Sequence, residues 1–188
     1  MQKKTVRVRV LTGAAVLAVA GAGTVGVLSA NAAPKNDTAQ TAQAKPAADL
    51  KKNETFTSTH LTVEAATKAA QAALDAAKKE NQRVSVAVVD RNGNTVVTLR
   101  GDGAGPQSYE SAERKAFTAV SWNAPTSELV KRLAQTPNLK DIPGTLFLGG
   151  GAPVADKGAP IAGIGVAGAP SGDLDEKFAQ AGVAALGK

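Results

Sequence analysis

The fold is decided by the stretch Val84-Ser85-Val86-Ala87-Val88-Val89-Asp90-Arg91-Asn92-Gly93-Asn94-Thr95-Val96-Val97-Thr98-Leu99. Two runs rich in β-branched residues flank the pair Asn92-Gly93. Such runs favour strands, and Asn-Gly readily adopts the positive φ angles that a tight turn needs. The stretch therefore predicts an antiparallel β-hairpin.

Helical periodicity lies on both sides of this hairpin. Before it, alanine and leucine recur at three- and four-residue steps over residues 61–77, and Thr62 is placed to cap that helix. After it, a second helix is predicted over residues 108–121. A shorter helix follows, with Thr126 as its N-cap.

The last part of the chain returns to strands. We predict strands at 145–148 and 161–167, with a turn at 156–158 between them. A final helix is predicted from Asp173, with Glu176 completing a carboxylate version of the capping box. The order α-β-β-α-α-β-β-α, with room for a fifth strand, indicates an α+β fold: one layered domain whose antiparallel sheet is flanked by helices.

The N-terminus has the three parts of an export signal. Basic residues open the chain, an apolar stretch covers residues 10–28, and the small-residue site Ala30-Asn31-Ala32 follows. A transmembrane anchor is the alternative, but the stretch is rich in Gly and Ala and a polar segment follows it. We therefore expect a signal peptide at 1–32, a flexible tether at 33–58, one domain at 59–188, and a secreted, extracellular or cell-wall-associated protein.

Composition excludes several classes of function. The chain has a net charge of +6, but four of its 22 basic residues and none of its 16 acids lie in residues 1–32, so the remainder carries only +2. A nucleic-acid partner is therefore not expected. The absence of Cys excludes disulfides, thiolate ligands and covalent haem attachment. His60 is the only histidine, which excludes a metal site built from several histidines.

Two motif-based alternatives lack the structural surroundings that their motifs require. Gly163-Ile164-Gly165-Val166-Ala167-Gly168 satisfies G-x-G-x-x-G, but these glycines fall inside a predicted strand and open no helix. Close packing by a helix or a subunit neighbour explains them better than a dinucleotide. A hydrolase would need His60 as its base, and the sequence shows neither a G-x-S-x-G elbow nor an acid placed to orient that histidine.

Several segments together resemble the GlcG/HbpS-like haem-binding family, in particular its secreted actinobacterial sensor proteins. The resemblance covers about Thr59 to Lys188, and its segments are residues 86–93, 100–104, 111–119, 149–154 and 163–168. It implies a five-stranded or similar antiparallel sheet with helices on both sides, a homo-octamer, non-covalent haem b and a separate surface iron. It also implies that a membrane sensor histidine kinase of a two-component system reads redox or iron status from the protein. An Ala- and Gly-rich core independently favours a homo-oligomer.

The iron prediction rests on Glu110 and Glu113. They are three residues apart on the second predicted helix, so both carboxylates share one face and can converge on a cation. The resemblance matches them to a surface E-x-x-E iron motif. The alternative is an ordinary exposed face on which Glu110 pairs with Arg114. Two carboxylates alone bind iron weakly, so further ligands would be needed.

The haem prediction rests on a short list of donors. Beyond residue 32 the usual axial donors are His60 and Tyr109, because Cys is absent and the one Met is Met1. The resemblance implies a haem-contacting His at the start of the domain, here His60, and a haem-contacting Thr, here Thr145. Their ordinary roles would be an exposed residue before a helix and a β-branched strand residue. The sequence leaves open a sensor, a haem-degrading enzyme and a haem scavenger or store.

Overall fold

A computed structural model describes residues 48–187, and its main elements follow the predicted order α-β-β-α-α-β-β-α. The predicted signal peptide and most of the predicted tether lie outside these residues. Two short 3-10 turns, η1 (Lys52–Glu54) and η2 (Pro137–Asp141), accompany the following elements: α1 (Val63–Lys79), β1 (Ser85–Asp90), β2 (Thr95–Arg100), α2 (Ser108–Trp122), α3 (Thr126–Arg132), β3 (Gly151–Asp156), β4 (Ala159–Ala167) and α4 (Gly172–Leu186). No helix in this range is long and apolar enough to cross a bilayer.

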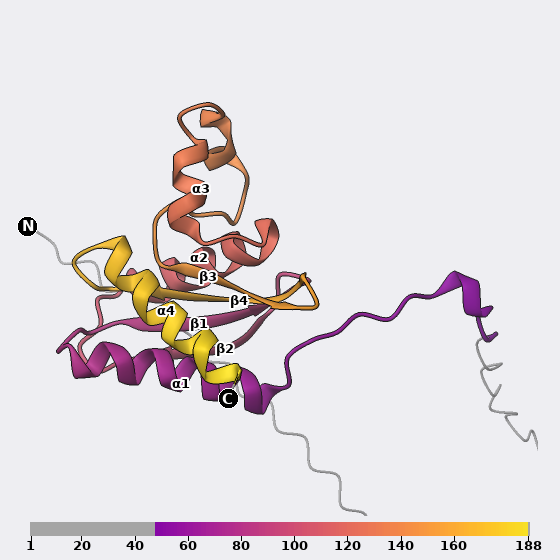
Figure 1. Ribbon diagram of the computed structural model, residues 1–188, viewed down its shortest axis with the longest axis horizontal. Helices are drawn as coiled ribbons and strands as arrows, with labels where there is room; N and C mark the ends of the chain where they lie inside the picture. The colour runs from indigo at the N-terminus through magenta and orange to yellow at the C-terminus, as the bar shows by residue number, and fades with distance from the viewer. Residues whose placement is uncertain (1–47, 188) are drawn as a thin grey trace, which may run out of the picture. The chain divides into compact units, whose positions relative to one another are not determined.

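The strands form one sheet in the order β2-β1-β4-β3, and each neighbouring pair is antiparallel. Figure 1 shows α1 and α4 on one face of the sheet and α2 on the other. Because strand side chains alternate, Val86 and Val88 pack with α1 and α4, while Ala87 and Val89 pack with α2. The predicted α+β class with helices on both faces is confirmed, and the described part of the sheet has four strands.

Glycines on β4 allow α2 to approach the sheet closely. A Cβ at Gly163 would overlap the carbonyl oxygen of Ala116, and one at Gly165 would overlap that of Ala112. The residues that α2 turns toward the sheet at these points are themselves alanines. For Gly163 and Gly165, this confirms the predicted close packing by a helix.

The strand predicted at 145–148 is wrong. This segment is irregular, and the strand begins only at Gly151. Side chains of α2 bond its backbone instead: Leu146 N donates to Thr118 Oγ1 at 2.8 Å, and Arg114 Nη2 donates to the Thr145 carbonyl at 2.8 Å. With these groups occupied, the segment does not pair with a strand.

Two predicted helix caps are also wrong. Pro125, rather than Thr126, is the N-cap of α3, and the Thr126 hydroxyl accepts a hydrogen bond from Gly151 N. Ser171 caps α4 through Leu174 N, so Glu176 is free for another role. The Thr62 cap of α1 is confirmed, because its hydroxyl accepts from Ala65 N.

Candidate functional site

His60 lies just before α1, with one ring nitrogen toward a hydroxyl and the other toward a carboxylate. Its Nε2 is 2.8 Å from Ser58 Oγ, and its Nδ1 is 3.8 Å from Asp90 Oδ2. The side chains of His60 and Asp90 are 34% and 16% exposed. The pair is thus partly shielded from water but remains open to a ligand.

Asp90 ends β1, and the hairpin turn holds its carboxylate in place. Oδ1 accepts the backbone N–H groups of Asn92 and Asn94 at 2.8 and 2.9 Å, and Oδ2 accepts from Asn94 Nδ2 at 3.2 Å. Burial acts to raise the pKa of Asp90, but these hydrogen bonds and the nearby His60 outweigh it and lower that pKa below its ordinary value. The expectation that no acid is placed to orient His60 is therefore wrong.

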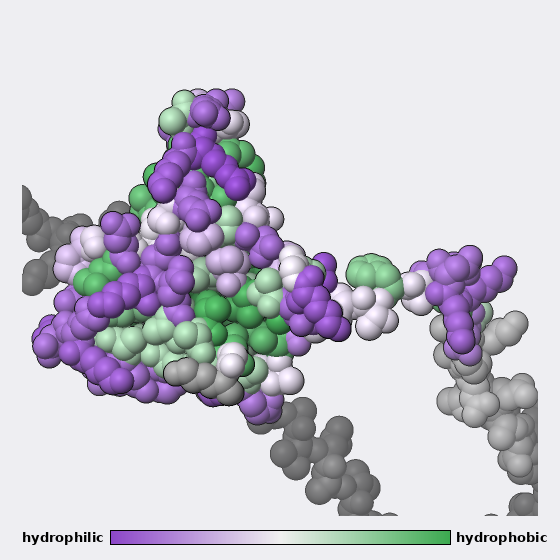
Figure 2. Space-filling view, in the orientation of Figure 1, coloured by the Kyte–Doolittle hydropathy of each residue, from purple (hydrophilic) through white to green (hydrophobic). Residues whose placement is uncertain are grey.

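An apolar groove adjoins the His60 segment. It has a volume of about 390 Å³, and Thr59 and Leu61, the neighbours of His60, line it. Its other apolar walls are Val154, Ile161, Val183 and Leu186. Figure 2 shows hydrophobic surface between α4 and the β3–β4 hairpin, where these residues lie. His60 itself is not a lining residue, but it lies between two residues that are, next to an apolar surface that a flat hydrophobic ligand can cover.

The other two predicted haem contacts lie on the far face of the sheet. Thr145 is buried against α2, and its hydroxyl donates to the Ile142 carbonyl at 2.7 Å. Tyr109 is 44% exposed on the first turn of α2. His60 contacts Asp90 on the α1 and α4 side, so one protomer does not bring it together with Thr145 and Tyr109. The roles of all three stay predictions.

Glu110 and Glu113 have separate partners. Glu110 is exposed, and its Oε1 lies 3.8 Å from Arg114 Nη1. Glu113 accepts a hydrogen bond from Thr98 Oγ1 of β2 at 3.1 Å. Across residues 48–187 no group of three or more His, Cys, Asp and Glu side chains is placed to hold a metal. The two glutamates therefore have different partners within one protomer, and the surface iron site stays a prediction.

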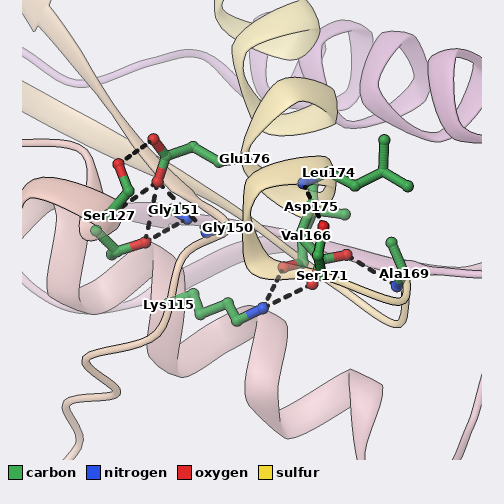
Figure 3. A network of polar contacts seen from close by, with 11 residues as sticks. Lys115, Ser127, Gly150, Gly151, Val166, Ala169, Ser171, Leu174, Asp175 and Glu176 are labelled. Atoms are coloured by element: carbon green, nitrogen blue, oxygen red, sulfur yellow. Dashed lines mark hydrogen bonds and ion pairs between the residues drawn. The ribbon is translucent and has the colours of Figure 1, made fainter. Parts of the chain in front are cut away.

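Sequence analysis missed a buried charged network, shown in Figure 3. Lys115 of α2 donates to Asp175 Oδ2 at 2.8 Å and to the Val166 carbonyl at 3.0 Å. Glu176 accepts from both the backbone N and the hydroxyl of Ser127, at 2.9 and 2.6 Å. This network ties α2 and α3 to α4. The sequence signal was a lysine within the alanine-rich face of α2, at a position that helical periodicity assigns to the core.

A larger pocket, of about 440 Å³, lies beside this network at the N-terminal end of α4. Lys115, Val130 and Leu148 are among its lining residues. Neither histidine nor tyrosine lines it. No histidine or tyrosine lines the smaller groove either, but both chain neighbours of His60 do, so that groove is the better haem candidate.

Comparison with known proteins agrees with these features. Residues 61–184 match the model of a family described as "Haem degrading protein HbpS-like". The chain belongs to the HbpS-like family. The match spans every element from α1 to most of α4. The resemblance expected from the sequence is therefore confirmed.

Solved HbpS-like structures share this fold. A crystal structure of Streptomyces reticuli HbpS, bearing Glu-to-Asp changes at two positions three apart, is 75% identical with a TM-score of 0.76, covering 78% of this chain and 99% of that one. The crystal structure of a PduOC:heme complex is 29% identical with a TM-score of 0.62, covering 68% and 95%. A curated relative, an uncharacterized 15.0 kDa protein of Citrobacter freundii, is 34% identical over 57% of this chain and 80% of its own length.

Proposed function

We propose that this protein binds haem b non-covalently, with His60 as an axial ligand. The observation that carries the proposal is the position of His60 between Thr59 and Leu61, two residues that line an apolar groove, in a chain of the HbpS-like family. The PduOC relative, which this chain matches over nearly the whole of that relative's length, was crystallised with haem. The donor set fits, because an imidazole is a usual haem ligand and an apolar wall suits the face of the porphyrin.

Within this site the chain's own groups have separate tasks. Bound haem supplies an iron centre that responds to redox conditions. His60 would supply a ring nitrogen to the iron, and the groove residues Leu61, Val183 and Leu186 would cover apolar porphyrin surface and keep water from it. Thr145 and Tyr109 lie on the other side of the sheet, so they contact the same haem only if a second subunit brings them to it. A homo-octamer, which the resemblance implies, offers such subunit contacts.

Replacing His60 is expected to lower haemin affinity at least tenfold. The His60→Ala chain loses the axial nitrogen while its groove remains, so weak apolar binding persists. Tyr109→Phe keeps the ring and removes only the phenolic oxygen, and is expected to bind haemin like the parent. Titration with haemin, followed by the Soret band, measures both. If Tyr109→Phe loses the band and His60→Ala keeps it, the tyrosine is the ligand instead.

Haem degradation is the second candidate activity, because the family description contains the words "haem degrading". The same haem-loaded preparation separates the two functions. Stable binding leaves the Soret band intact after a reductant or peroxide is added. Ring cleavage removes the band with time and releases iron, in proportion to the protein present. A haem scavenger or store would bind haem stably without altering the activity of a sensor kinase.

A surface iron site at Glu110 and Glu113 is proposed as distinct from haem. Two observations support this site. Glu110 and Glu113 are the only two glutamates in the chain that are three residues apart. The two glutamates replaced by aspartate in the Streptomyces reticuli HbpS variant have the same spacing. Changing both to Gln is expected to lower ferrous iron binding about tenfold or more, because the amides keep the size but lose the charge. Haemin affinity should stay within twofold. Equal loss of iron and haemin, or loss of neither, would contradict two separate sites.

Secretion and signalling are the finer part of the proposal. Residues 1–32 read as an export signal, and the family resemblance implies a membrane sensor histidine kinase that reads redox or iron status. The chain has no Cys, so a redox signal cannot pass through a disulfide and would depend on haem, iron or an oxidised aromatic residue.

A further inference from the structure

We infer that Asp90 and Ser58 position His60 for iron: Asp90 fixes the ring orientation and tautomer, and the Ser58 hydroxyl occupies the ligating nitrogen until haem arrives. This rests on the proposed function, since it concerns the same histidine. The ring of His60 lies between the two side chains, with Nδ1 toward Asp90 Oδ2 at 3.8 Å and Nε2 toward Ser58 Oγ at 2.8 Å.

The carboxylate determines which nitrogen carries the proton. An ionised Asp90 can only accept, so the favourable arrangement has the proton on Nδ1, facing Oδ2. At 3.8 Å this contact is an electrostatic attraction rather than a hydrogen bond. The lone pair then lies on Nε2, where the Ser58 hydroxyl donates to it. Nε2 is therefore the nitrogen prepared to bind a metal.

Asp90 is a rigid anchor for this role. Its carboxylate is held by the backbone amides of Asn92 and Asn94 within the β1–β2 hairpin. His60, by contrast, lies on the extended segment before α1, outside any helix or strand. The attraction to Asp90 thus links a less constrained residue to the sheet and restricts the orientation of the imidazole. A carboxylate behind a ligating histidine also makes the imidazole a stronger electron donor.

Ser58 can leave without any change in the fold. It is two residues from His60, is only partly buried, and has no other hydrogen bond within the described part of the chain. Rotation about its χ1 angle therefore releases Nε2. The hydroxyl competes with iron for the same lone pair, so its loss should favour haem.

Three single variants of the full mature chain test the inference. Asp90→Asn keeps an oxygen for the turn amides but removes the charge; we expect haemin affinity to fall about tenfold and the midpoint potential of bound haem to become more positive. Ser58→Ala removes the competing hydroxyl; we expect haemin affinity to rise about threefold to tenfold, the value of one hydrogen bond. Asp141→Asn, an exposed aspartate on η2, is the matched control and should change neither quantity.

The outcomes separate this inference from the proposed function. If the parent does not bind haemin at micromolar concentration, both fail. If the parent binds and His60→Ala does not, while Asp90→Asn and Ser58→Ala match the parent in affinity and potential, the proposed function stands and the positioning role is overturned. The potential is the decisive readout, because a purely structural loss at the turn would lower affinity without moving it. Ser58→Ala alters a partly exposed side chain, so it remains a valid test even if Asp90→Asn unfolds.

Discussion

Replacing Gly165 by Ala is expected to destabilise the domain by about 3 kcal/mol or more. The new Cβ would overlap the carbonyl oxygen of Ala112 and lie 2.5 Å from the amide nitrogen of Ala116. Both obstacles are helix backbone, which cannot rotate aside as a side chain can. Overpacking of a core usually costs about 1–3 kcal/mol, and contact with rigid backbone places this site at or above the upper limit. Urea unfolding followed by circular dichroism measures the loss.

A matched control is available at the end of α4. Gly187 has no atom within 4 Å of where a Cβ would lie and does not have a positive φ angle. Gly187→Ala should therefore change the free energy of unfolding by less than about 0.5 kcal/mol. If Gly165→Ala were as stable as this control, the close approach of α2 to β4 would be wrong.

The hairpin and the helices could be predicted because their signals are local. Asn92-Gly93 fixes a turn through its own backbone preferences, and the alanine periodicity of residues 61–77 depends only on neighbours one turn away. The segment 145–148 could not be predicted in this way. Its Thr-Leu-Phe-Leu sequence favours a strand, yet its backbone groups bond to Arg114 and Thr118, about 30 residues earlier in the chain.

The site shows the same division. Because Glu110 and Glu113 are three residues apart, any α-helix places them on the same face, and their proximity follows from the spacing alone. The contact between His60 and Asp90 joins residues 30 positions apart, and it requires both the end of β1 and the path of the chain into α1. The contact between Ser58 and His60 depends less on the fold, because the two residues are two apart on an extended segment and alternate side chains of such a segment point the same way.

Replacing Lys115 by Met is expected to destabilise the domain by about 3–5 kcal/mol. The side chains of Lys115 and Asp175 are 6% and 4% exposed, and their Nζ and Oδ2 atoms are 2.8 Å apart. Burial raises the pKa of Asp175 even though Lys115 and the amides of Ala169 and Gly168 act to lower it. Without Lys115, the carboxylate and the Val166 carbonyl would lose their buried donor. Removing one partner of a buried ion pair typically costs this much.

Two further variants show whether burial is the reason. Lys177 forms an ion pair with Glu80 at 2.6 Å, but their side chains are 62% and 39% exposed. Lys177→Met should therefore cost no more than about 1 kcal/mol. The double change Lys115→Met with Asp175→Asn should be more stable than Lys115→Met alone, because the amide can still accept from Ala169 N and leaves no unpaired charge. Urea unfolding at pH 7 compares all three. If Lys115→Met cost no more than Lys177→Met, water would be solvating Asp175, and the network would not be the clamp that holds α2 against α4.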